Sequence, residues 1–267
     1  MTKKNKLLLY TGPCVLESEK LVLEMGEKLV RTLEPYRNDI ELHFKGSFDK
    51  ANRTSINSYR GPGIDEGMRL LKLVKDTYKL PVITDFHEAS QAMKLASVVD
   101  VLQVPAFLCR QTDMIAAGAE ACQKFNRVLK VKKGQFLSPE ETKNIVDKAT
   151  TFLPKEKILL TERGTTFGYN NLVVDMASFQ IMKSFGVRTV HDATHCVQRP
   201  GGLGSATGGK REQILVLAKA AIAAGADGIF MECHPTPDQA LSDPSTSLQI
   251  DELPRIIDQL LKIYQVV

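Results

Sequence analysis

The stretch from His43 to Gly61 carries the residue types that bind small anions. It reads HFKGSFDKANRTSINSYRG, with lysines and arginines interleaved with hydroxyl and amide side chains. Fixed positive charge and short donors bind phosphate or carboxylate oxygens through charge-assisted hydrogen bonds. A solvated basic loop is the alternative, but an unstructured loop of about twenty residues is usually functional or disordered, and its apolar residues argue against disorder. We therefore expect this stretch to bind a doubly anionic small ligand.

Short apolar segments alternate with amphipathic helical periodicity along the whole chain. Strands buried on both faces are expected at about 7–10, 40–45, 81–85, 101–104, 127–132, 157–162, 187–192 and 228–232. Helices are expected at about 18–33, 65–78, 89–97, 111–123, 139–150, 172–184, 211–224 and 251–265. Eight such units in 267 residues, with no change in composition that would mark a linker, predict an α/β fold: a single (β/α)₈ TIM barrel over 1–267. A doubly wound sheet is disfavoured, because no glycine-rich dinucleotide fingerprint follows the first strand.

A barrel places its catalytic groups at the carboxyl ends of the strands. Every expected strand ends at, or just before, a polar, ionisable or metal-binding side chain. These residues are Cys14, Lys45, Asp85 with His87, Gln103, Lys132, Arg163, His195 and Glu232. Positions that served only the core would be mostly Val, Ile or Leu, so the pattern predicts a chemically active barrel mouth.

Four of the cations are expected to converge on that mouth: Lys45, Lys50, Lys132 and Arg163. Unpaired like charges repel one another when they are partly desolvated, so such a mouth needs an anionic guest. A sugar phosphate together with a second anion fits better than a single phosphate. For the neighbouring Lys133, a position on the surface rim is a credible alternative.

A metal site is expected at Cys14, His195, Glu232 and Asp243, which come from the first, seventh and eighth strands and the loop after the eighth. These strands are neighbours in a closed barrel. One thiolate, one imidazole and two carboxylates suit Zn²⁺, Fe²⁺ or Mn²⁺. Taken alone, Cys14 fits equally well as a small buried hydrophobe. That second reading is preferred for Cys109, Cys122, Cys196 and Cys233.

Several other polar residues could have either a structural or a functional role. His43 and His191 are expected to be buried and structural, whereas His87 and His234 should lie near the mouth. The segment GSATGGKR almost matches a P-loop, but Arg211 replaces the Ser or Thr that would hold Mg²⁺, so we expect a glycine-hinged lid or phosphate loop. Arg110 begins a polar segment, Arg110 to Asp113, that follows the fourth expected strand. This segment could belong to the functional site or could equally well be an ordinary helix cap.

Composition limits the remaining classes of function. A net charge of +4 is mild, and no basic helix interleaved with aromatic residues is present, so nucleic acid is not an expected partner. Five cysteines without a CxxC pair favour a reducing compartment over a disulfide framework. The apolar run near the N-terminus is shorter than a signal peptide requires, and no segment reaches transmembrane length. We expect a cytoplasmic protein without a membrane partner.

Nine sequence motifs, spread over essentially the whole chain, resemble those of one enzyme family. GPCVLES (12–18), FKGSFDKANRTSINSYRGPG (44–63), TDFHE (84–88), QVPAFLCRQTD (103–113), VKKGQFLSP (131–139), TERGTTFGYNNLVVDM (161–176), DATHCVQ (192–198), GGLGSATGG (201–209) and ALSDPSTSL (240–248) resemble 3-deoxy-D-manno-octulosonate 8-phosphate synthases. The resemblance implies condensation of phosphoenolpyruvate with D-arabinose 5-phosphate and water, for the lipopolysaccharide inner core. The related 3-deoxy-D-arabino-heptulosonate 7-phosphate synthase, which uses erythrose 4-phosphate, is the alternative. A Schiff-base aldolase using Lys132 and a catalytically silent sugar-phosphate sensor are further rivals.

The resemblance also implies roles for individual residues. Phosphoenolpyruvate would be held by Lys45, Ser47, Lys50, Lys132 and Arg163, and arabinose 5-phosphate by Asn52, Arg53 and Thr54 with Asp85 near its hydroxyls; Gln103 and Ala106 would complete the substrate site. Lys50, Lys132, His195 and Asp243 are the expected catalytic residues. Arg110 would reach a neighbouring subunit of a homotetramer. By the same resemblance, Cys14 would place the chain with the metal-dependent branch of the family, which has Cys where the other branch has Asn.

Overall fold

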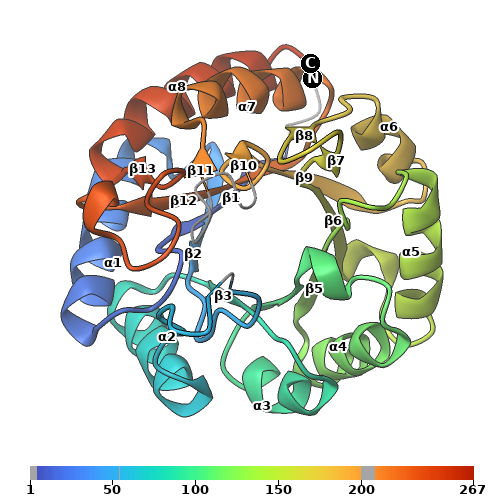
Figure 1. The fold of residues 1–267 in the computed structure, drawn as a ribbon, viewed down its shortest axis with the longest axis horizontal. Coiled ribbons are helices and arrows are strands. Elements are labelled where there is room, and N and C mark those ends of the chain that lie inside the picture. The colour runs from blue at the N-terminus through green and yellow to red at the C-terminus, as the bar shows by residue number, and fades with distance from the viewer. Residues whose placement is uncertain (1–4, 54, 200–207) are drawn as a thin grey trace.

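A closed ring of parallel strands forms the centre of the molecule. The computed structural model describes residues 5–53, 55–199 and 208–267. The ring runs β1-β2-β3-β4-β5-β6-β9-β12, and β12 pairs back onto β1. Its strands are β1 Leu7–Gly12, β2 Ile40–Lys45, β3 Val82–Asp85, β4 Val101–Val104, β5 Val128–Lys132, β6 Ile158–Glu162, β9 Arg188–Asp192 and β12 Gly228–His234. Figure 1 shows the helices outside this ring. The predicted (β/α)₈ TIM barrel and all its expected strands are confirmed.

The outer layer consists of the helices that connect the strands. They are α1 Glu19–Leu33, α2 Ile64–Tyr78, α3 Ala92–Ala96, α4 Thr112–Phe125, α5 Lys143–Thr150, α6 Ser178–Lys183, α7 Ile214–Ala223 and α8 Leu253–Tyr264. Before α5, Ser138 Oγ accepts from the Glu141 amide, and a Glu141 carboxylate oxygen accepts from the Ser138 amide, which is the reciprocal capping pattern that marks a helix start. None of the described helices combines the length and the apolar composition needed to cross a bilayer.

Short hairpins above the ring depart from the predicted pattern. The helix expected at 172–184 starts only at Ser178, because β8 (Leu172–Val173) pairs antiparallel with β7 (Thr165–Thr166). The turn between them uses two positive φ angles, 68° at Gly168 and 51° at Asn170. β10 (Gln198–Arg199) pairs with β11 (Gly208–Gly209), and β13 (Leu248–Gln249) lies beside β12. Most of the predicted lid or phosphate loop, residues 200–207, lies outside the described residues.

Two apolar clusters hold the barrel together. The larger one fills the space between strands and helices and includes Leu129 and Val131 of β5. The smaller one fills the interior of the ring and consists of Leu8, Tyr10, Ile83, Val101, Leu159, Val190 and Phe230. Because side chains alternate along a strand, Lys130 and Lys132 of β5 face inward while Leu129 and Val131 face the helices. The interior is therefore apolar at its base and increasingly polar toward the carboxyl ends of the strands.

Candidate active site

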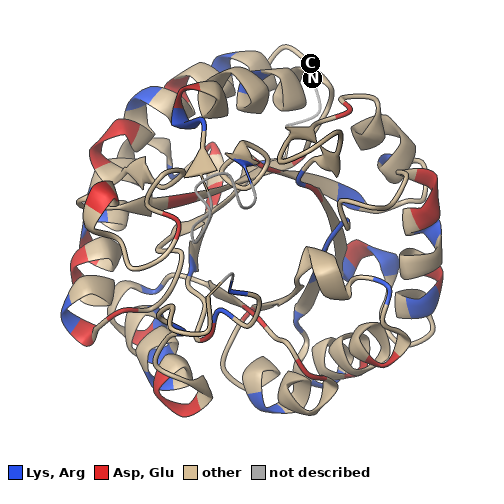
Figure 2. Cartoon of the chain, in the orientation of Figure 1, with Lys and Arg blue, Asp and Glu red and all other residues tan. Residues whose placement is uncertain are grey.

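A cavity of about 710 Å³ opens at the carboxyl ends of the barrel strands. The predicted site residues that line it are Lys45, Ser47, Lys50, Asn52, Arg53, Asp85, Gln103, Ala106, Lys132, Arg163, His195, Glu232 and Asp243. Figure 2 shows Lys and Arg on the strands around the centre as well as on the outer helices. Side chains from β2 to β12 thus converge as the barrel requires. Thr54 lies outside the described residues.

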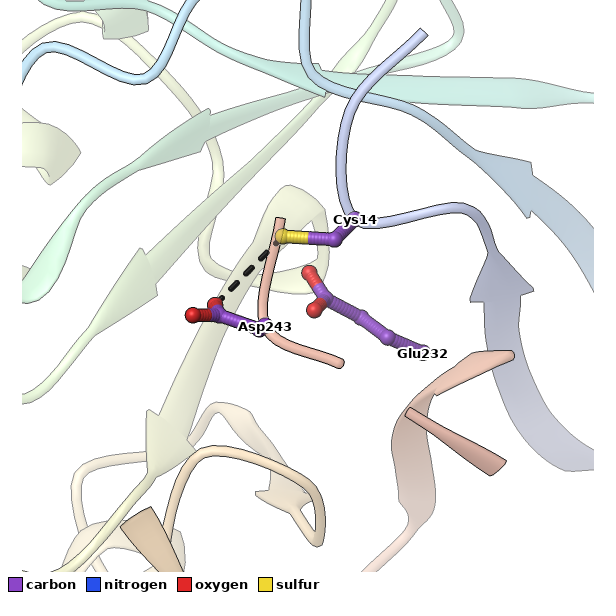
Figure 3. Close-up of side chains that lie close together, drawn as sticks. All are labelled: Cys14, Glu232 and Asp243. Carbon is purple, nitrogen blue, oxygen red and sulfur yellow. Dashed lines mark hydrogen bonds between the residues drawn. The ribbon is translucent and has the colours of Figure 1, made fainter. Parts of the chain in front are cut away.

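Three of the four predicted metal ligands come together beside this cavity, and the fourth, His195, lies next to two of them. Cys14, Glu232 and Asp243 each offer a ligand atom, and these atoms all lie within 4.8 Å of one another. Figure 3 shows the three side chains close together, with the hydrogen bond between Cys14 and Asp243 dashed. His195 Nε2 lies 3.5 Å from Glu232 Oε1 and 3.8 Å from Asp243 Oδ2. Residues more than two hundred positions apart therefore form one group of soft and hard donors.

Gly12 explains how Cys14 reaches this group. A Cβ at this position would lie 2.1 Å from the Lys45 carbonyl oxygen, so only glycine lets the chain leave β1 this close to β2. Two residues later Cys14 is 4% exposed, and its thiol donates to Ser242 Oγ at 2.9 Å and to Asp243 Oδ2 at 3.4 Å. Burial, reinforced by the charge of Glu232, raises the pKa of this thiol.

The donor set fits a divalent cation. Glu232 Oε2 is buried and has no hydrogen-bond partner among the residues that the structure describes. Burial would raise the pKa of Glu232, but the charges of His195 and Lys45 outweigh it and keep that pKa well below its ordinary value. Asp192 Oδ1 binds His195 Nδ1 at 2.9 Å, so Nε2 is the nitrogen available to a metal. A cation here would satisfy the carboxylate oxygen and favour the thiolate.

Asp192 is the functional residue that sequence reasoning missed. It is fully buried, and its second carboxylate oxygen accepts from Lys132 Nζ at 2.6 Å. Burial opposes its ionisation, yet His195 and Lys132 hold the pKa of Asp192 well below the usual range. One carboxylate therefore fixes both the imidazole and a cavity lysine. The signal was present in the segment HDAT, where an acidic residue stands at the carboxyl end of β9.

The cavity cations divide into two kinds, which corrects the prediction that all of them are unpaired. Lys45 Nζ lies 2.5 Å from Glu232 Oε1, and Lys132 is paired with Asp192, so these two already have buried carboxylate partners. Lys50 Nζ donates to Ser47 Oγ at 3.1 Å, and Arg163 donates to Gln198 Oε1 at 3.0 Å. No ion pair involves Lys50 or Arg163 within the described part of the chain. Their charges remain available to an anion.

The outer part of the cavity is formed by the loop after β2 and by the end of β3. Arg53 Nε donates to the Tyr59 carbonyl, and its Nη2 donates to the Leu241 carbonyl, both at 3.0 Å. Asp85 Oδ2 lies 3.0 Å from His87 Nε2, and Asp85 Oδ1 has no hydrogen-bond partner among the described residues. This end offers both a cation and a carboxylate, which are groups that suit a phosphorylated polyol.

Two predicted positions differ from expectation. Arg110 does not line the cavity; its side chain is 66% exposed, and its nearest carboxylate is Glu141 at 3.9 Å. Lys133 is not at the surface rim but fully buried, 3.4 Å from Glu162 Oε2 and 3.0 Å from Thr165 Oγ1. The loop that follows β5 covers Lys133 and accepts its hydrogen bonds. Lys133 therefore connects the loop after β5 to the loop after β6 through its hydrogen bonds.

The remaining cysteines and histidines mostly match their expected places. Cys109, Cys122, Cys196 and Cys233 are buried free thiols. His43 and His191 are buried, and His43 packs on Tyr10 with ring centroids 4.7 Å apart. His87 lines the cavity, whereas His234 is not among its lining residues and lies near Glu17.

Together, the closed barrel, the buried cations and the adjoining donor group define a class: barrel enzymes that act on small anionic substrates at the carboxyl ends of their strands. Residues 2–266 match the model of the DAHP synthetase I family, and the chain belongs to that family.

Curated relatives refine this assignment. The 2-dehydro-3-deoxyphosphooctonate aldolase of Trichlorobacter lovleyi is 50% identical over 98% of this chain and 93% of its own length. The proteins of the same name from Geobacter sulfurreducens and Pelobacter propionicus are 48% and 49% identical over 98% and 99% of this chain, and over 93% and 94% of their own lengths. That name denotes the octulosonate 8-phosphate synthases, so the resemblance seen in the motifs is confirmed.

Proposed function

We propose that this chain condenses phosphoenolpyruvate with D-arabinose 5-phosphate and water, giving 3-deoxy-D-manno-octulosonate 8-phosphate and inorganic phosphate for the lipopolysaccharide inner core. The observation that carries the proposal is identity of about half the residues over nearly the whole chain to enzymes named for the octonate product. The cavity supports it, since it combines buried cations with an outer end suited to a sugar phosphate. The seven-carbon alternative is not favoured by those names.

Phosphoenolpyruvate would occupy the inner end of the cavity. Lys50 and Arg163, which have no carboxylate partner within the described residues, supply charge for its phosphate and carboxylate. Ser47, Ala106 and Gln103 line the same cavity and are proposed to contact the same substrate. Lys132 adds a cation whose position is fixed by Asp192. Fixed charges of this kind stabilise developing negative charge without reorganisation when the phosphate leaves.

The pentose phosphate would occupy the outer end. Arg53, Asn52 and Thr54 are proposed to bind its phosphate, and Asp85 its hydroxyls. The aldehyde carbon would then face C3 of phosphoenolpyruvate, where the new carbon–carbon bond forms. Water adds at C2, and the C–O bond to phosphate breaks. Holding two dianions face to face is the main cost of this reaction, and it accounts for the surplus of Lys and Arg.

Cys14, His195, Glu232 and Asp243 are proposed to hold one divalent cation, Zn²⁺, Fe²⁺ or Mn²⁺. A cation bound there would lower the pKa of coordinated water or orient the aldehyde. His195 and Asp243 border the cavity, so they would face the aldehyde end of the pentose. Asp192 keeps His195 in the tautomer that leaves Nε2 free.

We also propose a cytoplasmic homotetramer. Five free thiols suit a reducing compartment. The exposed guanidinium of Arg110, which does not reach the cavity of its own subunit, is available to the site of a neighbour. Sedimentation of the wild type and of Arg110→Ala tests the assembly and the contribution of this residue.

The reaction is tested by the mass of its product. Incubation with phosphoenolpyruvate and either arabinose 5-phosphate or erythrose 4-phosphate should give the eight-carbon acid phosphate in preference to the seven-carbon one. Borohydride should trap no substrate on Lys132. Preferred formation of the seven-carbon product, or a trapped adduct, would reject the proposal in favour of a rival.

A further inference from the structure

Lys130 lies inside the barrel below the cavity and has no part in the function proposed above. It is on β5, two residues before Lys132, and its side chain is fully buried. Its Nζ lies 4.8 Å from the centroid of the Phe230 ring and 5.5 Å from that of Tyr10, both members of the interior apolar cluster. Elsewhere in that cluster the positions are occupied mainly by aliphatic residues.

Burying an amine at this position costs free energy of folding. No carboxylate lies within 4.0 Å of Lys130 in the described part of the chain, so its charge has no partner to compensate for lost hydration. Burial strongly lowers the pKa of Lys130, and the neighbouring charge of Lys132 acts in the same direction. A methionine or leucine would fill the same layer without this cost. The amine therefore calls for an explanation other than packing.

The contact that the amine makes points to that explanation. Lys130 Nζ donates to Gln103 Oε1 at 2.8 Å, and the two residues are register partners on adjacent strands β4 and β5. Gln103 is itself 3% exposed and lines the cavity. A carboxamide has one accepting end and one donating end. With Oε1 held by Lys130, the Nε2 amide is the end left for a ligand in the cavity.

We propose that Lys130 is a positioning residue: it fixes the carboxamide of Gln103 so that the Nε2 amide donates to an anionic oxygen of phosphoenolpyruvate. This inference rests on the proposed function for the identity of the anion. A reversed carboxamide would turn a carbonyl oxygen toward the ligand and repel it. An apolar residue at position 130 would leave both orientations open, so part of the binding energy would be spent on selecting one of them.

The test is a double-mutant cycle read by calorimetric titration of phosphoenolpyruvate, which does not depend on turnover. Lys130→Met should raise the Kd severalfold, with about tenfold, the size of one whole hydrogen bond to a charged group, as the upper limit. In a Gln103→Ala background the same replacement should change the Kd less than about twofold, because the group that it positions is gone. Leu159→Met, which alters the same interior cluster at the β6 register partner of Lys130 and keeps both Lys130 and Gln103, is the matched control.

Three results would overturn the inference: an unchanged Kd in Lys130→Met, an equal loss of affinity in the Gln103→Ala background, or an equal loss in Leu159→Met. If Lys130→Met does not fold, Lys130→Leu replaces it, and failure of both would show that the amine is required by the barrel itself. The KM for arabinose 5-phosphate should stay within about twofold in the variant. Absence of turnover in the wild type would reject the proposed reaction. The titrations would still test whether Lys130 positions Gln103, because they measure binding and not turnover.

Discussion

The buried ion pair between Lys45 and Glu232 gives a prediction whose size follows from the structure. Their side chains are 2% and 1% exposed, and Nζ and Oε1 lie 2.5 Å apart. Lys45 also donates to the Cys14 carbonyl at 2.7 Å. Lys45→Met leaves a carboxylate buried without its partner, which typically costs about 3–5 kcal/mol of unfolding free energy. We expect a loss of that size in protein freed of metal by chelation.

Urea unfolding followed by far-ultraviolet circular dichroism measures this loss, since the chain has no tryptophan to report by fluorescence. Glu232→Gln alone should also destabilise, and the double variant should recover most of the loss, giving a coupling energy of at least about 2 kcal/mol. Lys72→Met is the control, because the Lys72–Asp76 pair is 63% and 57% exposed, and solvent screening leaves so exposed a pair little effect on stability. A Lys45–Glu232 coupling as small as the control's would refute the reasoning.

Three further predictions concern single residues. Cys14→Asn should lower the metal content measured by mass spectrometry while the fold persists, whereas Cys109→Ala should keep it; equal metal content in both would remove Cys14 from the ligand set. Arg53→Ala should raise the KM for arabinose 5-phosphate far more than that for phosphoenolpyruvate, and an equal rise would contradict the assignment. Burial lowers the pKa of His191 from 6.5 to about 4, so the unfolded chain binds the extra proton first as pH falls. Stability should therefore drop between about pH 7 and pH 5, and His191→Gln should lessen that drop by about 2 kcal/mol in urea titrations; a slope identical to the wild type's would refute it.

Much of the site could be predicted because a parallel barrel makes position along the chain informative. The strands are short and mostly rich in apolar residues, so a polar residue at or near a carboxyl end, such as Lys45 or Glu232, is predicted to lie at the mouth. Closure of the ring brings the first and last strands together, which is why Cys14 and Asp243 could be grouped without any local motif.

The contacts between these residues could not be predicted in the same way. In the sequence Asp192 looks like one more strand end, and its hydrogen bonds to both Lys132 and His195 are visible only in the folded barrel. Lys133 follows Lys132 directly, yet alternation turns it away from the mouth and beneath the loop that covers it. Charge alone could not distinguish a paired lysine from one available to a ligand, because pairing depends on which carboxylate lies across the barrel.

Phosphate release from phosphoenolpyruvate by the metal-loaded protein tests the central claim most directly. We predict rapid release that requires arabinose 5-phosphate, is much slower with erythrose 4-phosphate, and falls when the metal is removed by chelation. Release that proceeds equally well without the pentose phosphate, or none with either sugar, would contradict the account.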